Sequence, residues 1–315
     1  MLQSMFVTLY KSTNHCEWNM FAAKAKNAHF FFQREYMEYH EERFEDYSLM
    51  VHDDKERLVA LLPATKEKND LISHGGLTFG GFLIDNCMTV SLMLKTFDCV
   101  MDFLRENGFH SWIYKCIPYI YHHYPAEEDK YSLFMNHANL VRRDVSTTIY
   151  LPEKYSYETR RKRAVKKGIK NGIVVRQSDA FEAYISIVND VLGNYHNAKA
   201  VHTGKELRML AERFPDNIKL YVGERDGKML AGTVIFENGH TVHTQYLANS
   251  DEGRNCGALD VVIDYLLNNV YANKTYFDFG ISNEKDGRYL NEGLISQKEG
   301  FGARAVVHDF YELTL

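Results

Sequence analysis

The segment from residue 241 to residue 279 constrains the fold more than any other part of this 315-residue chain. Residues 241–248 alternate in polarity and predict a strand, and residues 249–255 form a polar turn. Residues 256–258 (Cys-Gly-Ala) then open an apolar helix, and residues 276–279 (Tyr-Phe-Asp-Phe) predict a second strand. A helix that begins directly after such a turn leaves backbone N–H groups unpaired. These groups and the helix dipole attract anions, so we expect a phosphate-binding site at this helix start.

Four residues of the turn carry this prediction. The main-chain N–H groups of Asn255, Gly257 and Ala258 are expected to bind a pyrophosphate, and the guanidinium of Arg254 adds charge-assisted hydrogen bonds. Two other interpretations stay open. In one, Arg254 is an ordinary surface arginine in a polar turn, and in the other, Gly257 is a packing glycine at the helix start.

The composition bounds the class of protein. A hydrophobic content of 45% and a charged content of 25% are typical of a globular protein, and the length suits two domains. A net charge of −5 argues against a dedicated nucleic-acid binder. The five cysteines are widely spaced without a Cys-x-x-Cys pair, which predicts neither a disulfide framework nor a zinc site. The histidines and acidic residues at 122–129 lack ligand spacing, so no metal site is expected. The chain shows no signal-peptide pattern and no run of about 18 apolar residues, and we expect a cytoplasmic protein without a membrane span.

The order of predicted elements repeats along the chain. In the first half we expect strands over 5–10, 48–51, 58–62, 112–116 and 145–150, and helices over 14–25, 90–106 and 131–138. In the second half we expect helices over 158–170, 178–193, 203–214 and 291–298, with strands over 173–176, 219–223, 229–236 and 303–311. This repetition predicts an α/β (α+β) protein of two domains, over 1–146 and 147–315. Each is expected to hold a mixed, mainly antiparallel sheet flanked by helices.

Two local motifs predict specific turns in the second half. Asp226-Gly227 lies between two strand patterns and is typical of a two-residue hairpin. Thr203 precedes Glu206 in the spacing of a capping box, which predicts a helix that begins there.

Four stretches of the sequence resemble tandem-GNAT proteins of the Fem type. They are Leu-Val-Ala-Leu-Leu-Pro at 58–63, Ser-His-Gly-Gly-Leu-Thr-Phe-Gly-Gly at 73–81, Tyr-Phe-Asp-Phe-Gly at 276–280 and Gln-Lys-Glu-Gly-Phe-Gly at 297–302. The family comprises bacterial aminoacyl transferases that build peptidoglycan cross-bridges and relatives described as GNAT N-acetyltransferases. The resemblance spans nearly the whole chain. It implies two tandem GNAT-like domains, a degenerate first one on the acceptor side and a second one that holds the acyl donor.

The resemblance also implies how the donor binds. The spacing Arg254-x-x-Gly257-Ala258 is similar to the acyl-CoA pyrophosphate loop of GNAT enzymes, although Leu259 replaces the last small residue. The pantetheine arm is expected between the two strands of the segment, bound by main-chain groups of Leu247 and Ala248. Diverging strands expose N–H and C=O groups that such an arm satisfies. Acyl-CoA, with acetyl-CoA as the simplest form, is therefore the expected co-substrate, without a metal.

Acyl transfer to an amine needs a base and a group that stabilises the oxyanion. His243 and Gln245 lie two residues apart in a strand and are expected on one face. Asp278 alternates with phenylalanines, and a carboxylate buried there needs a partner or a raised pKa. Lys298 matches the lysine of the Fem-type Phe-Lys-x-x-Phe-Gly signature, which favours transition-state charge in that family, whereas Ser296 replaces the tyrosine acid of many GNAT enzymes. Alternatively, His243 and Gln245 are packed under a helix and Lys298 is a surface lysine.

The acceptor site is the least defined part of the prediction. Arg163, in the basic run 160–170, and Arg142, near the domain junction, are candidates to hold a phosphorylated acceptor or an RNA acceptor stem. Tyr195 and His202 are candidates because they lie just ahead of the capped helix. The alternatives are a solvated basic helix face and a loop that holds itself together.

These observations predict an acyltransferase that moves an acyl group from acyl-CoA to an amine on a small-molecule or cell-wall precursor. A second hypothesis is a Fem-like transferase that uses aminoacyl-tRNA and a peptidoglycan precursor. A third is a catalytically silent binding protein with the same fold.

Overall fold

The structure is a computed structural model that describes residues 5–196 and 199–315, with the side chains of residues 194–196 left outside the description. It consists of two compact units. The first comprises the residues up to Asp144 together with Lys285–Arg288 and Val307–Leu315, and the second comprises Val145–Glu284 and Tyr289–Val306. The sequence placed one boundary near residue 146 and did not anticipate the two later segments that return to the first unit.

Two sheets form the frame of the first unit. Their strands are β1 (Phe6–Leu9), β2 (Glu45–Asp46), β3 (Leu49–His52), β4 (Leu58–Leu62), β5 (Thr65–Glu67), β6 (Asp70–Ile72), β7 (Leu83–Ile84), β8 (Ser111–Lys115) and the end of β17 (Arg304–Thr314). The smaller sheet has the order β1-β3-β4-β7, and the other strands follow the order β17-β8-β6-β5-β2. The helices are α1 (His15–Lys24), α2 (Arg34–Met37), α3 (Val90–Glu106) and α4 (Glu128–Met135).

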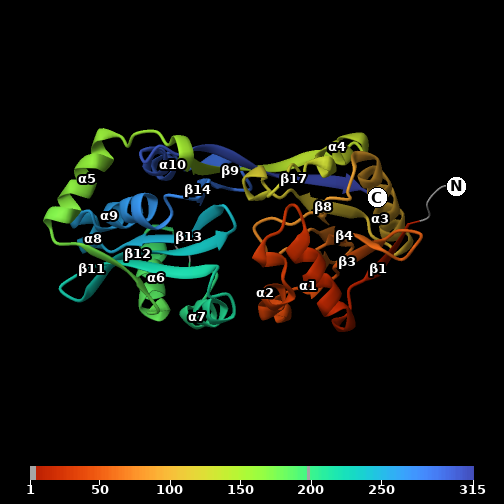
Figure 1. Cartoon of the computed structure of the whole chain (residues 1–315), viewed down its shortest axis with the longest axis horizontal. Helices are drawn as coiled ribbons and strands as arrows, with labels where there is room; N and C mark the ends of the chain where they lie inside the picture. Colours follow the sequence, from red (N-terminus) through yellow and green to blue (C-terminus); the bar gives the residue numbers. More distant parts are fainter. Residues whose placement is uncertain (1–4, 197–198) are drawn as a thin grey trace. The chain divides into compact units, whose positions relative to one another are not determined.

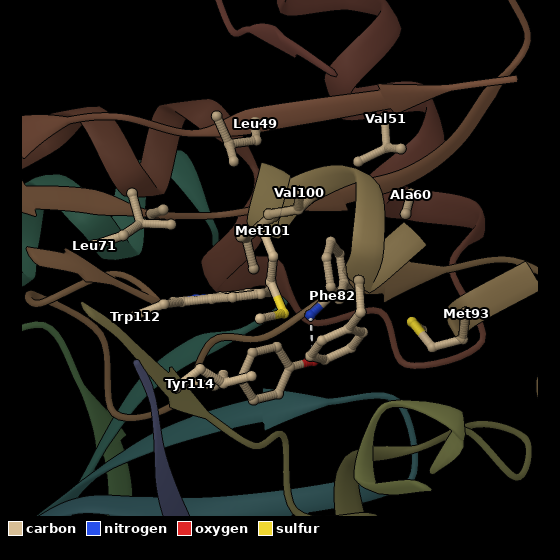
Figure 2. Close-up of a cluster of buried hydrophobic side chains, with 14 of the residues drawn as sticks. Leu49, Val51, Ala60, Leu71, Phe82, Met93, Val100, Met101, Trp112 and Tyr114 are labelled. Carbon is tan, nitrogen blue, oxygen red and sulfur yellow. Dashed lines mark hydrogen bonds between the residues drawn. The ribbon is translucent and has the colours of Figure 1, made fainter. Parts of the chain in front are cut away.

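The core of the first unit forms where the apolar side of α3 meets the strands. Met93, Phe97, Val100 and Leu104 recur at helical spacing and are fully buried. Figure 2 shows Met93 and Val100 of this helix in one cluster with side chains of the strands, Trp112 among them. A helix with a 3.6-residue apolar period packs in this way because one side of it is excluded from water.

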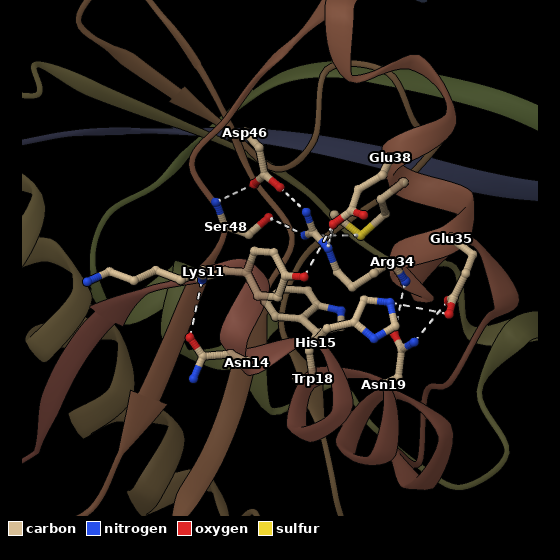
Figure 3. A network of polar contacts seen from close by, with 12 residues as sticks. Lys11, Asn14, His15, Trp18, Asn19, Arg34, Glu35, Glu38, Asp46 and Ser48 are labelled. Carbon is tan, nitrogen blue, oxygen red and sulfur yellow. Dashed lines mark hydrogen bonds and ion pairs between the residues drawn. The ribbon is translucent and has the colours of Figure 1, made fainter.

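A buried arginine organises the polar part of the same unit. Arg34 is 2% exposed, and its Nε donates to Glu38 at 2.8 Å while its Nη2 pairs with Asp46. The guanidinium carbon lies 3.7 Å from the ring centre of Tyr10. Figure 3 shows Arg34 with Glu38, Asp46 and the surrounding polar contacts. These contacts satisfy a charge that otherwise disfavours burial, so this network is structural.

The second unit is built on a sheet with the order β10-β11-β12-β13-β14-β9. Its strands are β9 (Asn139–Tyr150), β10 (Val174–Ser178), β11 (Ile218–Arg225), β12 (Lys228–Asn238), β13 (Thr241–Asn249) and β14 (Tyr276–Ile281), and a small hairpin adds β15 (Asn283–Glu284) and β16 (Tyr289–Leu290). Its helices are α5 (Thr159–Lys170), α6 (Phe181–His196), α7 (Gly204–Arg213), α8 (Asp251–Cys256), α9 (Ala258–Tyr265) and α10 (Glu292–Glu299). Figure 1 shows α5 and α9 side by side in this unit. The β13–β14 pair is parallel and the other neighbours in this order are antiparallel.

The predicted fold class, α/β with mixed sheets and flanking helices, is confirmed. The predicted helix over residues 90–106 has the bounds of α3. Asp226 and Gly227 both have positive φ, 53° and 74°, and join β11 to β12 as the predicted hairpin. The capping box of Thr203 and Glu206 at the start of α7 is also confirmed.

Candidate active site

Two strands that pair and then diverge define the site. β13 and β14 pair in parallel from Thr241↔Tyr276 to His243↔Asp278, where the pairing ends. Each strand is irregular at this point. The β12–β13 register shifts so that Gln245 is an extra residue, and the β14–β9 register shifts after Asp278. A bulge bends its strand and increases its twist, which explains the predicted divergence.

The strict alternation expected for β13 is therefore wrong beyond residue 244. A single sequence cannot reveal an extra residue in a strand, because the bulge depends on how the neighbouring strand pairs. Leu247 lies past the bulge and lines a pocket, whereas Ala248 is buried and stands opposite Gly232 of β12. Gln245 is half-buried.

An Asp–His pair lies where the two strands part. The His243 Nδ1 atom is 2.7 Å from Oδ2 of Asp278, whose side chain is fully buried. The other carboxylate oxygen accepts hydrogen bonds from Oγ of Ser146 at 2.5 Å and from Oγ1 of Thr148 at 2.8 Å. Three polar partners thus satisfy a carboxylate that has no access to water. Because an ionised carboxylate only accepts hydrogen bonds, Nδ1 donates in this contact, and in a neutral imidazole the lone pair then lies on Nε2.

Sequence reasoning found His243 and Asp278 and missed Ser146 and Thr148. Both hydroxyls come from β9, which pairs with β14 through Asp278↔Thr148. The available signal was the run of hydroxyl residues over 146–148 opposite a strand with one buried acid. Only the pairing register shows that they meet.

The absence of a side chain at Gly280 leaves room for the imidazole of His243. The φ of Gly280 is 76°, and a Cβ placed there lies 3.0 Å from Cε1 of His243. A larger residue at this position therefore meets both an unfavourable backbone conformation and the histidine ring.

Lys298 holds the end of β14. Its Nζ donates to the carbonyl oxygens of Gly280 at 2.8 Å and Ile281 at 2.7 Å, and the side chain is buried. Burial lowers the pKa of Lys298 to about 8, although the Asp278 carboxylate opposes this effect. The surface-lysine interpretation is therefore wrong, and the ammonium lies close to the Asp–His pair.

A pocket of about 700 Å³ has Lys298 in its wall. Its walls come from β13, β14 and the helices α6, α8, α9 and α10, and most of the lining surface is apolar. The lining residues are Val191, Leu192, Leu247, Asn249, Arg254, Leu259, Ile263, Phe279, Asn291, Gly293, Leu294, Gln297, Lys298 and Phe301. The pocket has the size and apolar lining of a small-molecule site.

The predicted phosphate-binding turn requires a correction. A short helix, α8, begins already at Asp251, so the helix start after β13 is not at Cys256. Gly257 lies between α8 and α9 with φ 82°, and a Cβ there lies 2.5 Å from the carbonyl oxygen of Ala164 in α5. Ala258 is 0% exposed. The expectation that N–H groups of Gly257 and Ala258 face solvent is wrong, because α5 packs over this turn.

The first turn of α9 already contains a charged pair. Asp260 in this turn pairs with Arg161 of α5 at 2.6 Å. Of the four predicted residues, Asn255 is exposed and Arg254 is 40% exposed and lines the pocket. Arg254 therefore remains a candidate to hold a negatively charged part of the donor.

Of the predicted acceptor residues, the three with described side chains do not line this pocket. His202 is buried, and its Nδ1 lies 2.8 Å from the hydroxyl of Tyr246. Arg163 is exposed on α5. Arg142, in the first unit, pairs with Asp144 at 2.7 Å and with the exposed Asp286 at 3.0 Å. Tyr195 falls within α6, and its side chain lies outside the described residues.

Two kinds of feature are absent from the described residues. No group of three or more His, Cys, Asp or Glu is placed for a metal ion in the described part of the chain. Over the same residues, no helix has both the length and the apolar character needed to cross a bilayer.

Residues 154–289 match the family model described as acetyltransferase (GNAT) domain. The second unit, which contains most of this segment, is therefore similar to a GNAT domain. A comparison with curated proteins finds no match. Among solved structures, FemX has a TM-score of 0.69 at 10% identity over 98% of this chain and 97% of its own. The C-terminal domain of a putative lysylphosphatidylglycerol synthetase from Agrobacterium fabrum has a TM-score of 0.62 at 10% identity, over 96% and 92% of the two chains. A tandem GNAT protein from the clavulanic acid biosynthesis pathway has a TM-score of 0.54 at 10% identity, over 99% and 98%.

These likenesses concern the fold, and they confirm the predicted resemblance to the GNAT and Fem-type proteins. The bulged strand, the diverging neighbour and the apolar pocket described above all belong to the second unit, which contains most of the matched GNAT segment.

Proposed function

We propose that the GNAT domain transfers an acyl group from an activated donor to an amine, with His243 as the general base. The observation that carries this proposal is the imidazole of His243, held through Nδ1 by the buried Asp278 at the point where β13 and β14 part. Its side chain is 14% exposed, and Nε2 is the ring nitrogen that does not contact Asp278, so we assign to Nε2 the uptake of the amine proton.

The reaction balances with these groups. The amine nitrogen forms a bond to the acyl carbon, and the carbonyl becomes a tetrahedral oxyanion. Nε2 of His243 takes the amine proton, the bond from the acyl carbon to the leaving sulfur or oxygen breaks, and this proton then passes to the leaving group. Lys298 contributes positive charge near the oxyanion in its protonated form. Asp278 stabilises the imidazolium that forms during the step.

Acyl-CoA is the donor that we favour. The pocket is lined by Leu247 and Phe279 from the two diverging strands, which suits the hydrocarbon parts of a pantetheine arm, and Arg254 lies at its wall to attract phosphate. The proposed acceptor is an amine on a small molecule or a cell-wall precursor.

An aminoacyl ester of tRNA is the second candidate donor, and one observation favours it. The turn at Gly257 and Ala258, which is expected to bind the CoA pyrophosphate, is buried beneath α5. A donor that needs no pyrophosphate-binding turn is compatible with this packing.

The donor is tested by thermal unfolding with acetyl-CoA and, separately, with charged tRNA. A ligand that binds only the native state raises the free energy of unfolding, by about 2.7 kcal/mol at a concentration of one hundred times its Kd, and therefore raises Tm. A shift with acetyl-CoA supports the first donor. A shift with charged tRNA alone assigns the second.

The chemistry is tested with His243→Gln and the control His110→Gln, in which an exposed histidine of the first unit is replaced. Removal of a general base lowers kcat by about 10² to 10⁴-fold. The assay follows release of free thiol from acetyl-CoA over a panel of amines. Turnover by folded H243Q within a few-fold of the control variant contradicts the assignment of the base.

A further inference from the structure

One side of α5 is buried and the other is strongly basic. Val165 and Gly168 are buried, Arg161 pairs with Asp260 of α9, and α5 packs beside α9 (Figure 1). The buried positions follow helical spacing, so the opposite side of the helix faces away from α9. This exposed side carries five cations, Lys162, Arg163, Lys166, Lys167 and Lys170, and we call them the α5 basic face.

The α5 basic face differs from the other charged surfaces of this unit. Several other cations of the unit are paired, for example Arg176 with Glu224 at 2.7 Å and Lys219 with Glu237 at 2.8 Å. Within the described residues, none of the five side chains of the α5 basic face has an ion pair or hydrogen-bond partner. The chain as a whole has a net charge of −5, so this concentration of positive charge is local. An uncompensated cluster of this kind attracts a polyanion.

Exposed aliphatic side chains accompany the α5 basic face. Ile169 is 60% exposed on the same helix, at the edge of the basic stripe by helical spacing. Val174, in the strand that follows, is 65% exposed. The helix itself contains no aromatic residue on which a nucleic-acid base could stack.

We propose that the α5 basic face docks the protein onto an anionic lipid surface. The cations meet the phosphate groups of the lipids, and Ile169 enters the boundary between head groups and acyl chains. This combination of unpaired cations and exposed aliphatic residues is what an interfacial helix requires. A single-stranded nucleic acid is the less favoured partner, because stacking residues are missing from the helix.

The test uses the full chain and vesicles of phosphatidylcholine with or without phosphatidylglycerol, in a sedimentation assay. We expect binding only to the anionic vesicles, and weaker binding as salt is raised. The variant K162Q/K166Q/K170Q removes three exposed cations, each of which contributes about fivefold, so the partition coefficient falls by roughly a hundredfold. The matched control K24Q/K95Q replaces two exposed helix lysines of the first unit and is expected to bind like the wild type.

The variant I169S separates lipid insertion from plain attraction between charges. It keeps every cation, and we expect a several-fold loss of vesicle binding without loss of fold, because Ile169 is largely exposed. Absence of wild-type binding to the anionic vesicles overturns the proposal. Equal binding by the wild type and the triple variant overturns it too, and so does binding to a single-stranded RNA in place of the vesicles. Acyl transfer between soluble substrates is independent of this surface, so a failure here leaves the proposed function intact.

Discussion

Replacement of Lys298 by methionine tests whether this lysine is buried beside the site as a titrating group. Lys298 is 4% exposed, and its ammonium donates hydrogen bonds to two carbonyl oxygens. The pKa of Lys298 falls from 10.5 to about 8 because burial disfavours the charged form. One pKa unit corresponds to about 1.4 kcal/mol, so protonated Lys298 lowers the free energy of unfolding by roughly 3 kcal/mol relative to the neutral form.

The sign of the pH dependence follows from proton binding. Between pH 8 and pH 10.5 the unfolded chain keeps the lysine proton while the native state releases it. Over this window, the free energy of unfolding of the wild type therefore rises with pH by up to roughly 3 kcal/mol relative to that of K298M. Below pH 8 both states are protonated, and the difference between wild type and variant is constant.

The measurement is urea unfolding of both proteins at a series of pH values from 7 to about 10.5, with the difference in unfolding free energy taken at each pH. This difference cancels the titration of all other groups. A matched variant, K162M, replaces an exposed lysine of α5 and is expected to run parallel to the wild type. Parallel curves for wild type and K298M contradict the argument, since they show that Lys298 titrates alike in the native and unfolded states.

Three further predictions concern the site itself. Asp278→Asn removes the acceptor that fixes the proton on Nδ1 of His243, so kcat is expected to fall by about 10² to 10⁴-fold while circular dichroism shows a retained fold; wild-type turnover would exclude a catalytic role for the pair. Gly280→Ala is expected to lower both stability and kcat, whereas Gly108→Ala, at the same φ of 76° with nothing within 4 Å, should lower stability by only about 1 kcal/mol; equal effects of the two would show that the contact with His243 is unimportant. Arg254→Ala should raise KM for acyl-CoA and leave kcat nearly unchanged, because the guanidinium lines the pocket away from the reacting atoms; isothermal titration with unaltered donor affinity would remove Arg254 from the site.

The contrast between His243 and Gln245 shows how far sequence patterns reach. Alternation placed both side chains on one face, and the histidine indeed meets Asp278 at the strand junction. The prediction failed at Gln245, because a bulge inserts it as an extra residue opposite β12. Period-two reasoning holds only while the neighbouring strand keeps its register.

The turn after β13 shows a second limit. Its glycine and its arginine matched a phosphate-binding pattern, and the sequence around Gly257 is compatible with an open helix start. In the structure Gly257 is needed for its φ of 82° and for the close approach of α5. Both uses favour glycine, so the residue type alone does not distinguish a ligand site from a packing contact.

The sequence by itself determined the elements of this protein, because apolar periodicity, caps and turn residues act over a few positions of the chain. It therefore predicted α3, the Asp226-Gly227 hairpin and the strands that carry His243 and Asp278. Only the tertiary structure decided that Ser146 and Thr148 donate hydrogen bonds to Asp278, that Lys298 is buried and that α5 covers the predicted phosphate-binding turn. These contacts join residues more than a hundred positions apart, or depend on which side of a helix is covered, and strand register and helix packing set both.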